Sequence, residues 1–117
     1  MPIPTEIRLR RAEKLLEIDF DDGTAFVLPA EYLRVESPSA EVKGHGPSER
    51  KTISGRRHVG MLGVEQVGHY AVRILFDDQH DTGIFSWEYL HELGRERTHK
   101  WHAYLDALKR QGLTRDP

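Results

Sequence analysis

The stretch Asp77–Gly94, DDQHDTGIFSWEYLHELG, carries the clearest structural signal in this sequence of 117 residues. It starts at the end of an apolar run, turns around His80 and continues into a short apolar strand. Ser86 then stands where a helix N-cap is expected, because its hydroxyl can accept a hydrogen bond from a first-turn N–H. The residues that follow, Trp87–Leu93, predict a helix, and Gly94 predicts its C-terminal end.

Alternating apolar and polar residues predict further strands on the N-terminal side of this stretch. Leu16, Ile18 and Phe20 alternate with acidic residues and end at an Asp-Asp-Gly turn, which is typical of a hairpin. Pro29 opens a short helix, since a helix start does not use the N–H that proline lacks. The predicted strands cover residues 6–10, 16–20, 24–28, 59–67, 70–76 and 83–85, and a last helix covers about 95–111.

Consecutive hairpins followed by two helices predict an α+β domain. We expect a mostly antiparallel sheet of about five to six strands, a short helix after the third strand and two C-terminal helices. No internal repeat and no second domain is apparent, so residues 1–117 are expected to form a single domain.

The segment 37–57 differs in composition from the rest of the chain. It is rich in glycine, proline, serine and charge, and it is poor in apolar residues. This composition predicts a long flexible surface loop. Four basic residues of the loop could contact an acidic partner or a phosphate: Arg50, Lys51, Arg56 and Arg57.

Composition excludes several classes of protein. The chain has no cysteine, which removes disulfides, thiolate nucleophiles and cysteine-ligated metal. The net charge of -2 gives no argument for a nucleic-acid partner. No apolar run approaches the roughly 20 residues of a membrane span, and the opening MPIPTEIRLRR lacks the apolar core of a secretory signal. A cytoplasmic protein that does not contact membranes is expected.

His80 is the strongest candidate for a residue with a chemical role. It lies in an acidic turn, where Asp77, Asp78 and Asp81 would raise its proton affinity. Three interpretations stay open: a turn histidine satisfied by its surroundings, a weak iron or zinc ligand, and a general base oriented by Asp81. Phosphate-binding loops, nucleophile elbows and a two-histidine-one-carboxylate iron site are missing from the sequence.

The exposed histidine pair predicted on the last helix carries less weight. His99 and His102 are three residues apart and could share a helix face, but two ligands are too few for a metal site. We therefore expect both to be solvated.

Five segments together resemble a known family, the small proteins labelled as domain of unknown function 971, which are similar to the N-terminal domain of gamma-butyrobetaine hydroxylase. The order and spacing of the segments carry the resemblance, which spans nearly the whole chain. The segments are PTEIRL at 4–9, LEIDFDDG at 16–23, LPAEYLR at 28–34, YAVRILFDD at 70–78 and HDTGIFSWEYL at 80–90.

The resemblance also implies where a structural zinc would lie. In the hydroxylase, the similar domain holds zinc through a Cys-x-Cys-x-x-Cys cluster and a histidine from a later turn. Here the histidine position falls on His80, and the thiolate positions fall near Ser37, Ser39 and Val42. Hydroxyls are weak zinc ligands and valine is none, so the resemblance implies this fold with the metal site lost.

The resemblance further suggests a cellular context, because similar domains are attached to some P-loop ATPases that carry iron–sulfur clusters. It implies an accessory role in metal-cofactor or oxygenase systems, without transferring an activity. The leading hypothesis is a non-enzymatic module that contacts a protein partner through an exposed sheet face or the 37–57 loop, with no cofactor expected. The alternative is an iron- or zinc-binding protein that uses His80 and the nearby carboxylates.

Overall fold

The first three strands form an antiparallel sheet in the computed structural model, which describes residues 2–38, 52–81 and 83–117. The strands are β1 (Pro4–Arg10), β2 (Leu15–Phe20) and β3 (Ala25–Pro29), in the order β1-β2-β3. Gly23 takes a positive φ of 88° in the predicted hairpin turn, a conformation that glycine adopts without steric cost. The inward residues of β2 are almost completely buried, as the alternation predicts.

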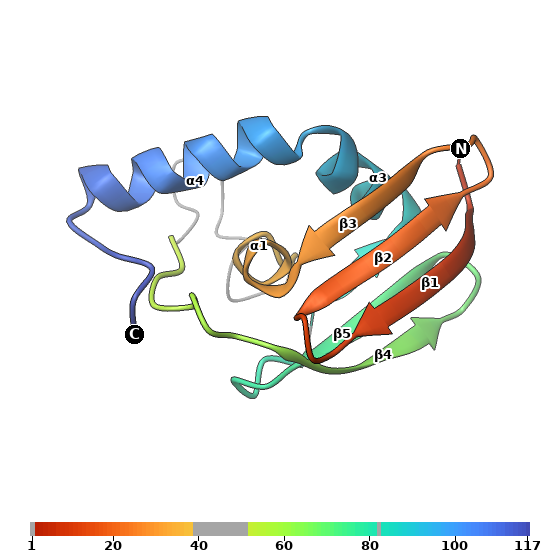
Figure 1. Ribbon diagram of the computed structural model, residues 1–117, viewed down its shortest axis with the longest axis horizontal. Coiled ribbons are helices and arrows are strands. Elements are labelled where there is room, and N and C mark those ends of the chain that lie inside the picture. The colour runs from red at the N-terminus through yellow and green to blue at the C-terminus, as the bar shows by residue number, and fades with distance from the viewer. Residues whose placement is uncertain (1, 39–51, 82) are drawn as a thin grey trace.

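The next three strands form a second antiparallel sheet, in the order β4-β5-β6. They are β4 (Met61–Val67), β5 (Ala71–Phe76) and β6 (Ile84–Ser86). The predicted α+β class and antiparallel pairing are confirmed, with the strands divided between two three-stranded sheets. Figure 1 shows the two sheets facing each other, with β1 and β4 on the same side of the molecule.

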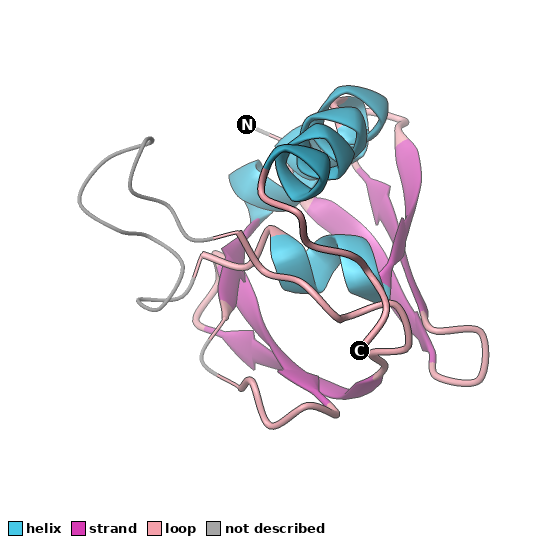
Figure 2. Cartoon of the chain, turned by 90° about the vertical axis from the view of Figure 1, so that its left-hand side faces the viewer, coloured by secondary structure: helices cyan, strands magenta, loops and turns pink. Residues whose placement is uncertain are grey.

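Helix α1 (Ala30–Val35) follows the third strand, as predicted, and closes one end of the space between the sheets (Figure 2). Pro29 precedes it as the N-cap residue, in extended conformation, and so ends β3 instead of opening the helix. The hydroxyl of Tyr32 donates a hydrogen bond of 2.7 Å to the backbone oxygen of Leu93, which ties α1 to the last part of the chain. The main core cluster contains, among others, Leu16, Ile18, Leu28, Leu33, Ile74, Phe76, Phe85 and Leu90.

The two C-terminal helices are α3 (Trp87–Arg95) and α4 (Arg97–Arg110). The predicted cap is confirmed, since the Ser86 hydroxyl accepts a hydrogen bond of 3.0 Å from the N–H of Tyr89. The predicted helix end at Gly94 is wrong, because α3 continues through Gly94 to Arg95. Gly94 serves packing instead: a Cβ at this position would lie 2.3 Å from Cγ of Phe26.

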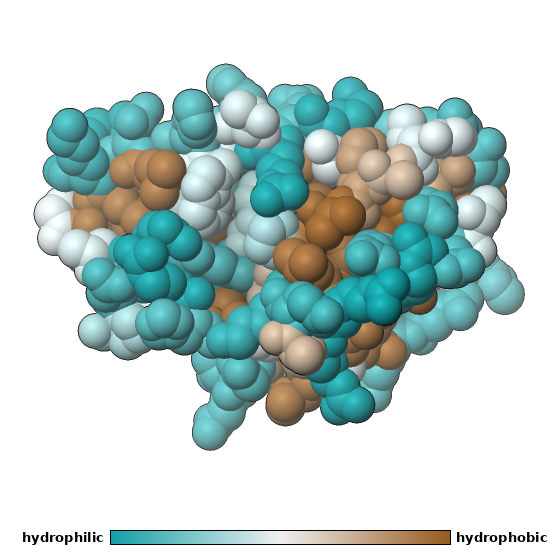
Figure 3. Space-filling model, in the orientation of Figure 1, coloured by the Kyte–Doolittle hydropathy of each residue, from teal (hydrophilic) through white to brown (hydrophobic). Residues whose placement is uncertain are grey.

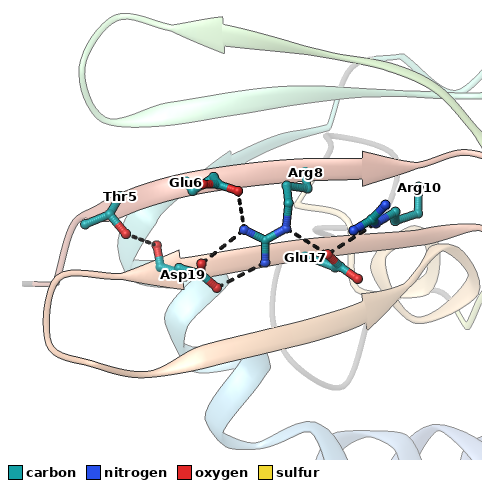
Figure 4. Close-up of polar contacts among 6 residues, drawn as sticks. All are labelled: Thr5, Glu6, Arg8, Arg10, Glu17 and Asp19. Atoms are coloured by element: carbon teal, nitrogen blue, oxygen red, sulfur yellow. Dashed lines mark hydrogen bonds and ion pairs between the residues drawn. The ribbon is translucent and has the colours of Figure 1, made fainter.

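The outer face of the first sheet is covered by a network of charged side chains (Figure 4). Arg8 donates to Glu17 at 2.8 Å and to Asp19 at 3.0 and 3.2 Å, and it also pairs with Glu6. The hydrogen bond from Arg8 lowers the pKa of Asp19. This face therefore satisfies its own charges. Along the described residues, no helix is long and apolar enough to cross a membrane.

Candidate functional site

The structure brings together two residues that the resemblance implicates, Ser37 and His80. Ser37 follows the end of α1 and is fully buried, and His80 follows β5 with 6% of its surface exposed. The Ser37 hydroxyl lies 3.0 Å from Nε2 of His80, within hydrogen-bond distance. The His80 backbone oxygen accepts a hydrogen bond of 3.0 Å from the Phe76 N–H, which holds the turn closed.

The residues at this position do not fit a structural zinc. A hydroxyl stands where the resemblance implies a thiolate, and neutral hydroxyls are weak zinc ligands. Ser39 and Val42, the other two implied positions, lie outside the described residues. Within residues 2–38, 52–81 and 83–117, no three histidine or acidic side chains group in a way that could hold a metal ion.

Asp78, the carboxylate nearest in sequence to His80 on its N-terminal side, serves an ion-pair cluster. Arg34 donates a hydrogen bond of 2.8 Å to Oδ2 of Asp78, and Nε of Arg56 lies 2.8 Å from the same oxygen. Oδ1 accepts the His80 N–H at 3.2 Å. Burial raises the pKa of Asp78, but the hydrogen bonds from Arg34 and His80 more than offset this, so the pKa falls below its usual value. The carboxylate is thus held ionised by two guanidinium groups.

A catalytic pair of His80 and Asp81 receives little support from this geometry. Asp81 is exposed, whereas the imidazole of His80 is buried against Ser37 and the ring of Phe76. A substrate could reach the imidazole only after these neighbours moved apart.

The predicted basic loop falls into two parts. Arg50 and Lys51 lie outside the described residues. Arg56 pairs with Asp78, and Nε of Arg57 donates a hydrogen bond of 2.5 Å to Asp116. Both described arginines therefore meet a carboxylate of the same chain.

A half-open cleft of about 500 Å³ lies between α1 and α4. Figure 3 shows the face on which α1 and α4 meet, where pale and hydrophilic surface lies between hydrophobic areas. The rings of Tyr32 and Trp101 pack edge to face, with centroids 6.3 Å apart. The cleft is lined by Pro29, Glu31, Tyr32, Arg97, Thr98, Trp101, His102 and Arg115.

Arg115 lies inside this cleft and makes its strongest interaction there. Nε and Nη2 of Arg115 donate hydrogen bonds of 2.8 and 2.6 Å to the two carboxylate oxygens of Glu31. Glu31 is only 7% exposed, and the bidentate pair raises the pKa of Arg115. The guanidinium also lies over the ring of Trp101, 5.1 Å from its centroid, within the range of a cation–π interaction.

The segment 113–117 runs beside the segment 52–57, and hydrogen bonds between the two segments hold Arg115 in place. The N–H groups of Gly55 and Arg57 donate hydrogen bonds of 3.0 Å to the carbonyl oxygens of Thr114 and Arg115. The hydroxyl of Tyr104 binds the backbone oxygen of Ile53 at 2.7 Å, which fixes the same segment from α4. Burial raises the pKa of this hydroxyl to about 12.

Sequence reasoning missed the cleft because its walls come from three separate parts of the chain: residues 29–32, residues 97–102 and Arg115. One member of the predicted histidine pair lies at the cleft. His99 and His102 are both exposed on α4, but only His102 is among the residues that line the cleft. An arginine, a tryptophan and a histidine within one turn and a half of helix were the available signal.

Comparison with known proteins identifies the family. The protein-family model described as gamma-butyrobetaine hydroxylase-like, N-terminal, matches residues 7–91. Two solution structures determined by NMR are similar to the whole chain, with 45% and 41% identity, TM-scores of 0.86 and 0.85, and coverage of 92% and 87% of their own chains.

A crystal structure of a protein of unknown function from Acidithiobacillus ferrooxidans, assigned to the DUF971 family, is 42% identical. The similarity covers 78% of this chain and 91% of that chain, with a TM-score of 0.66. No curated protein matches the sequence. The chain therefore belongs to the gamma-butyrobetaine hydroxylase-like N-terminal family, also called DUF971.

Proposed function

We propose that this protein is a non-enzymatic interaction module, and that it contacts a protein partner through the cleft between α1 and α4. The observation that carries the proposal is the composition of the cleft, where Tyr32 and Trp101 lie beside Arg97 and Arg115. Tryptophan, tyrosine and arginine are the residues that dominate the energetic centres of protein interfaces. A half-open cleft with such walls suits an anchoring side chain of a partner.

The burial of His80 and the ion pairs of Asp78 support a binding role over an enzymatic one. His80, the residue considered as a general base, is buried against Ser37. Asp78 is engaged by two arginines. A general base must lie within reach of the substrate, and His80 is only 6% exposed.

The family supplies the context of the proposal. Membership in a family that resembles the N-terminal domain of a hydroxylase is the basis for placing the partner in metal-cofactor or oxygenase systems. We take the partner to be a cytoplasmic protein of such a system, and we take the module itself to work without a cofactor.

A matched pair of substitutions on α4 tests the proposal. His102→Trp fills the cleft from its rim, whereas His99→Trp adds the same ring at an exposed position that does not line the cleft. We expect the partner, recovered with the wild-type chain by cross-linking in cells, to be lost from His102→Trp and retained by His99→Trp. Urea unfolding of both variants verifies that each is folded.

The opposite results are equally specific. Equal recovery with both variants would remove the cleft from the interface. The outer face of the second sheet carries the exposed residues Leu62 and Ile84, at 61% and 43% exposure. Loss of the partner from Leu62→Glu and Ile84→Glu, with His102→Trp unaffected, would move the contact to that sheet face.

A further inference from the structure

The interactions of Arg115 show which chemical group the cleft accepts. A buried carboxylate provides two acceptors in one plane, and the guanidinium of Arg115 meets both, at 2.8 and 2.6 Å from the oxygens of Glu31. An arginine can form this two-bond arrangement, whereas a lysine ammonium cannot reproduce it. The face of Trp101, 5.1 Å from the guanidinium carbon, supplies a second contact that favours a planar cation.

The segment 113–117, which carries Arg115 into the cleft, is mostly exposed. Leu113, Thr114, Asp116 and Pro117 are all exposed, and only Arg115 is half-buried. The two hydrogen bonds that align these residues with Gly55 and Arg57 use backbone groups only. Backbone hydrogen bonds do not depend on side-chain identity, so another segment that follows the same backbone path can form them.

We infer that the cleft and the neighbouring Arg57 form a binding site for an arginine followed by an acidic residue in a segment of a partner protein, and that Arg115 and Asp116 take these two positions within the same chain. This inference rests on the proposed function and names the chemistry of the partner. The two ion pairs have opposite polarity: Glu31 binds the arginine, and Arg57 binds the acidic residue at 2.5 Å. The order of the two residues is therefore part of what the site recognises.

The remainder of the cleft fits the same ligand. Its volume of about 500 Å³ lies next to Arg115 and is bordered by Arg97, Thr98 and His102. The basic side chain of Arg97 would repel a second cation. A segment with one arginine and a neighbouring acid meets favourable charges on both sides, whereas a strongly basic segment does not.

Because Arg115 is attached to the chain, it competes with any external arginine. A short covalent connection gives the attached group an effective concentration on the order of millimolar. The wild-type chain should therefore bind an external segment weakly, and removal of the Arg115 side chain should strengthen binding by roughly tenfold or more.

The test uses the full chain with Arg115→Ala and a synthetic peptide, Gly-Leu-Thr-Arg-Asp-Pro. We expect saturable binding, observed as shifts of the Trp101 indole N–H and the Gly55 amide in NMR spectra. A peptide with alanine in place of arginine, and one with the order Asp-Arg, should not bind. Glu31→Gln combined with Arg115→Ala should abolish binding. Should Arg115→Ala not fold, the wild-type chain at millimolar peptide should show the same shifts.

The outcomes separate this inference from the function on which it rests. Equal binding of the alanine peptide, or no binding by folded Arg115→Ala, overturns the arginine site even if His102→Trp still loses the partner. Peptide binding by Arg115→Ala together with undisturbed partner recovery by His102→Trp overturns the proposed function alone. A wild-type dimer that Arg115→Ala abolishes would assign the occupant to a second copy, against a separate partner.

Discussion

Gly94 in helix α3 lies directly against the aromatic ring of Phe26 in strand β3. A Cβ built on Gly94 would fall within 2.3–2.6 Å of three ring carbons, far inside van der Waals contact. The helix therefore approaches the sheet as closely as a backbone without a side chain allows. The ring of Phe26 also packs edge to face on Phe20, with centroids 5.9 Å apart.

Gly94→Ala should destabilise the protein in spite of the better helix propensity of alanine. The gain in propensity is about 1 kcal/mol, whereas forcing a methyl group into a filled space costs about 1–3 kcal/mol. Urea unfolding measures the difference. In a Phe26→Ala background the same change should become neutral or stabilising, and an equal cost in both backgrounds would show that the ring is not the obstacle.

Gly83→Ala should be destabilising by about 1–3 kcal/mol for a similar reason. The new Cβ would lie 2.2 Å from the Ser37 hydroxyl oxygen. Ser37→Ala removes this oxygen, so the cost of Gly83→Ala should fall in that background. The measurement is a double-mutant cycle from four unfolding curves, and additive costs would contradict the close contact.

Asp78→Asn should cost about 3–5 kcal/mol, because it leaves the buried guanidinium of Arg34 without its counter-charge. The Arg34 side chain is 8% exposed. The comparison is Arg56→Ala, whose side chain is 35% exposed and whose loss should cost under about 1 kcal/mol. Thermal or urea unfolding gives both values, and similar costs for the two variants would argue against burial as the cause.

Stability should fall with decreasing pH through the titration of Asp22. Hydrogen bonds from the Thr24 hydroxyl and N–H, and a further one with His91, lower the pKa of Asp22 from 3.8 to about 2. The unfolded chain then binds more protons than the folded chain between about pH 4 and 2, so stability is lost as pH falls through that window. Asp22→Asn should show a shallower pH dependence of the urea midpoint, and parallel curves would exclude this contribution.

Purified protein without a tag should retain no stoichiometric zinc or iron after incubation and desalting, because Ser37 offers a hydroxyl to the His80 side of the site. Elemental analysis and amide shifts around His80 provide the measurement. His102→Ala serves as the control for adventitious binding by an exposed imidazole. Stoichiometric metal that is lost only in His80→Ala would establish the metal-binding alternative.

The strands were predictable because each half-buried strand repeats its pattern over short distances. Leu16, Ile18 and Phe20 identify their strand and its inward face without any knowledge of the rest of the chain. The division into two sheets was not predictable in this way, because it depends on which strand edges stay unpaired. The helix end predicted at Gly94 was wrong for a related reason. The sequence does not distinguish a glycine that ends a helix from a glycine that leaves room for a neighbouring aromatic ring.

The candidate site was less accessible to sequence reasoning than the fold. Arg56 and Arg57 read as a free basic pair because their partners, Asp78 and Asp116, are distant in the chain. The cleft was missed because Glu31 and Arg115 are joined only by the folded structure. The family resemblance assigned Ser37 and His80 to one implied zinc site, and their contact of 3.0 Å became visible only in the folded structure.

The charge network around Arg8 also protects the molecule from unwanted association. Strand β1 is an edge of its sheet, and an open edge can recruit a strand from another molecule. On the outer face, however, Glu6, Arg8 and Arg10 would meet an incoming strand with charges that are already satisfied by Glu17 and Asp19. Association along this edge would desolvate these charged side chains without an electrostatic gain. The charges therefore disfavour aggregation, although β1 lies at the edge of its sheet.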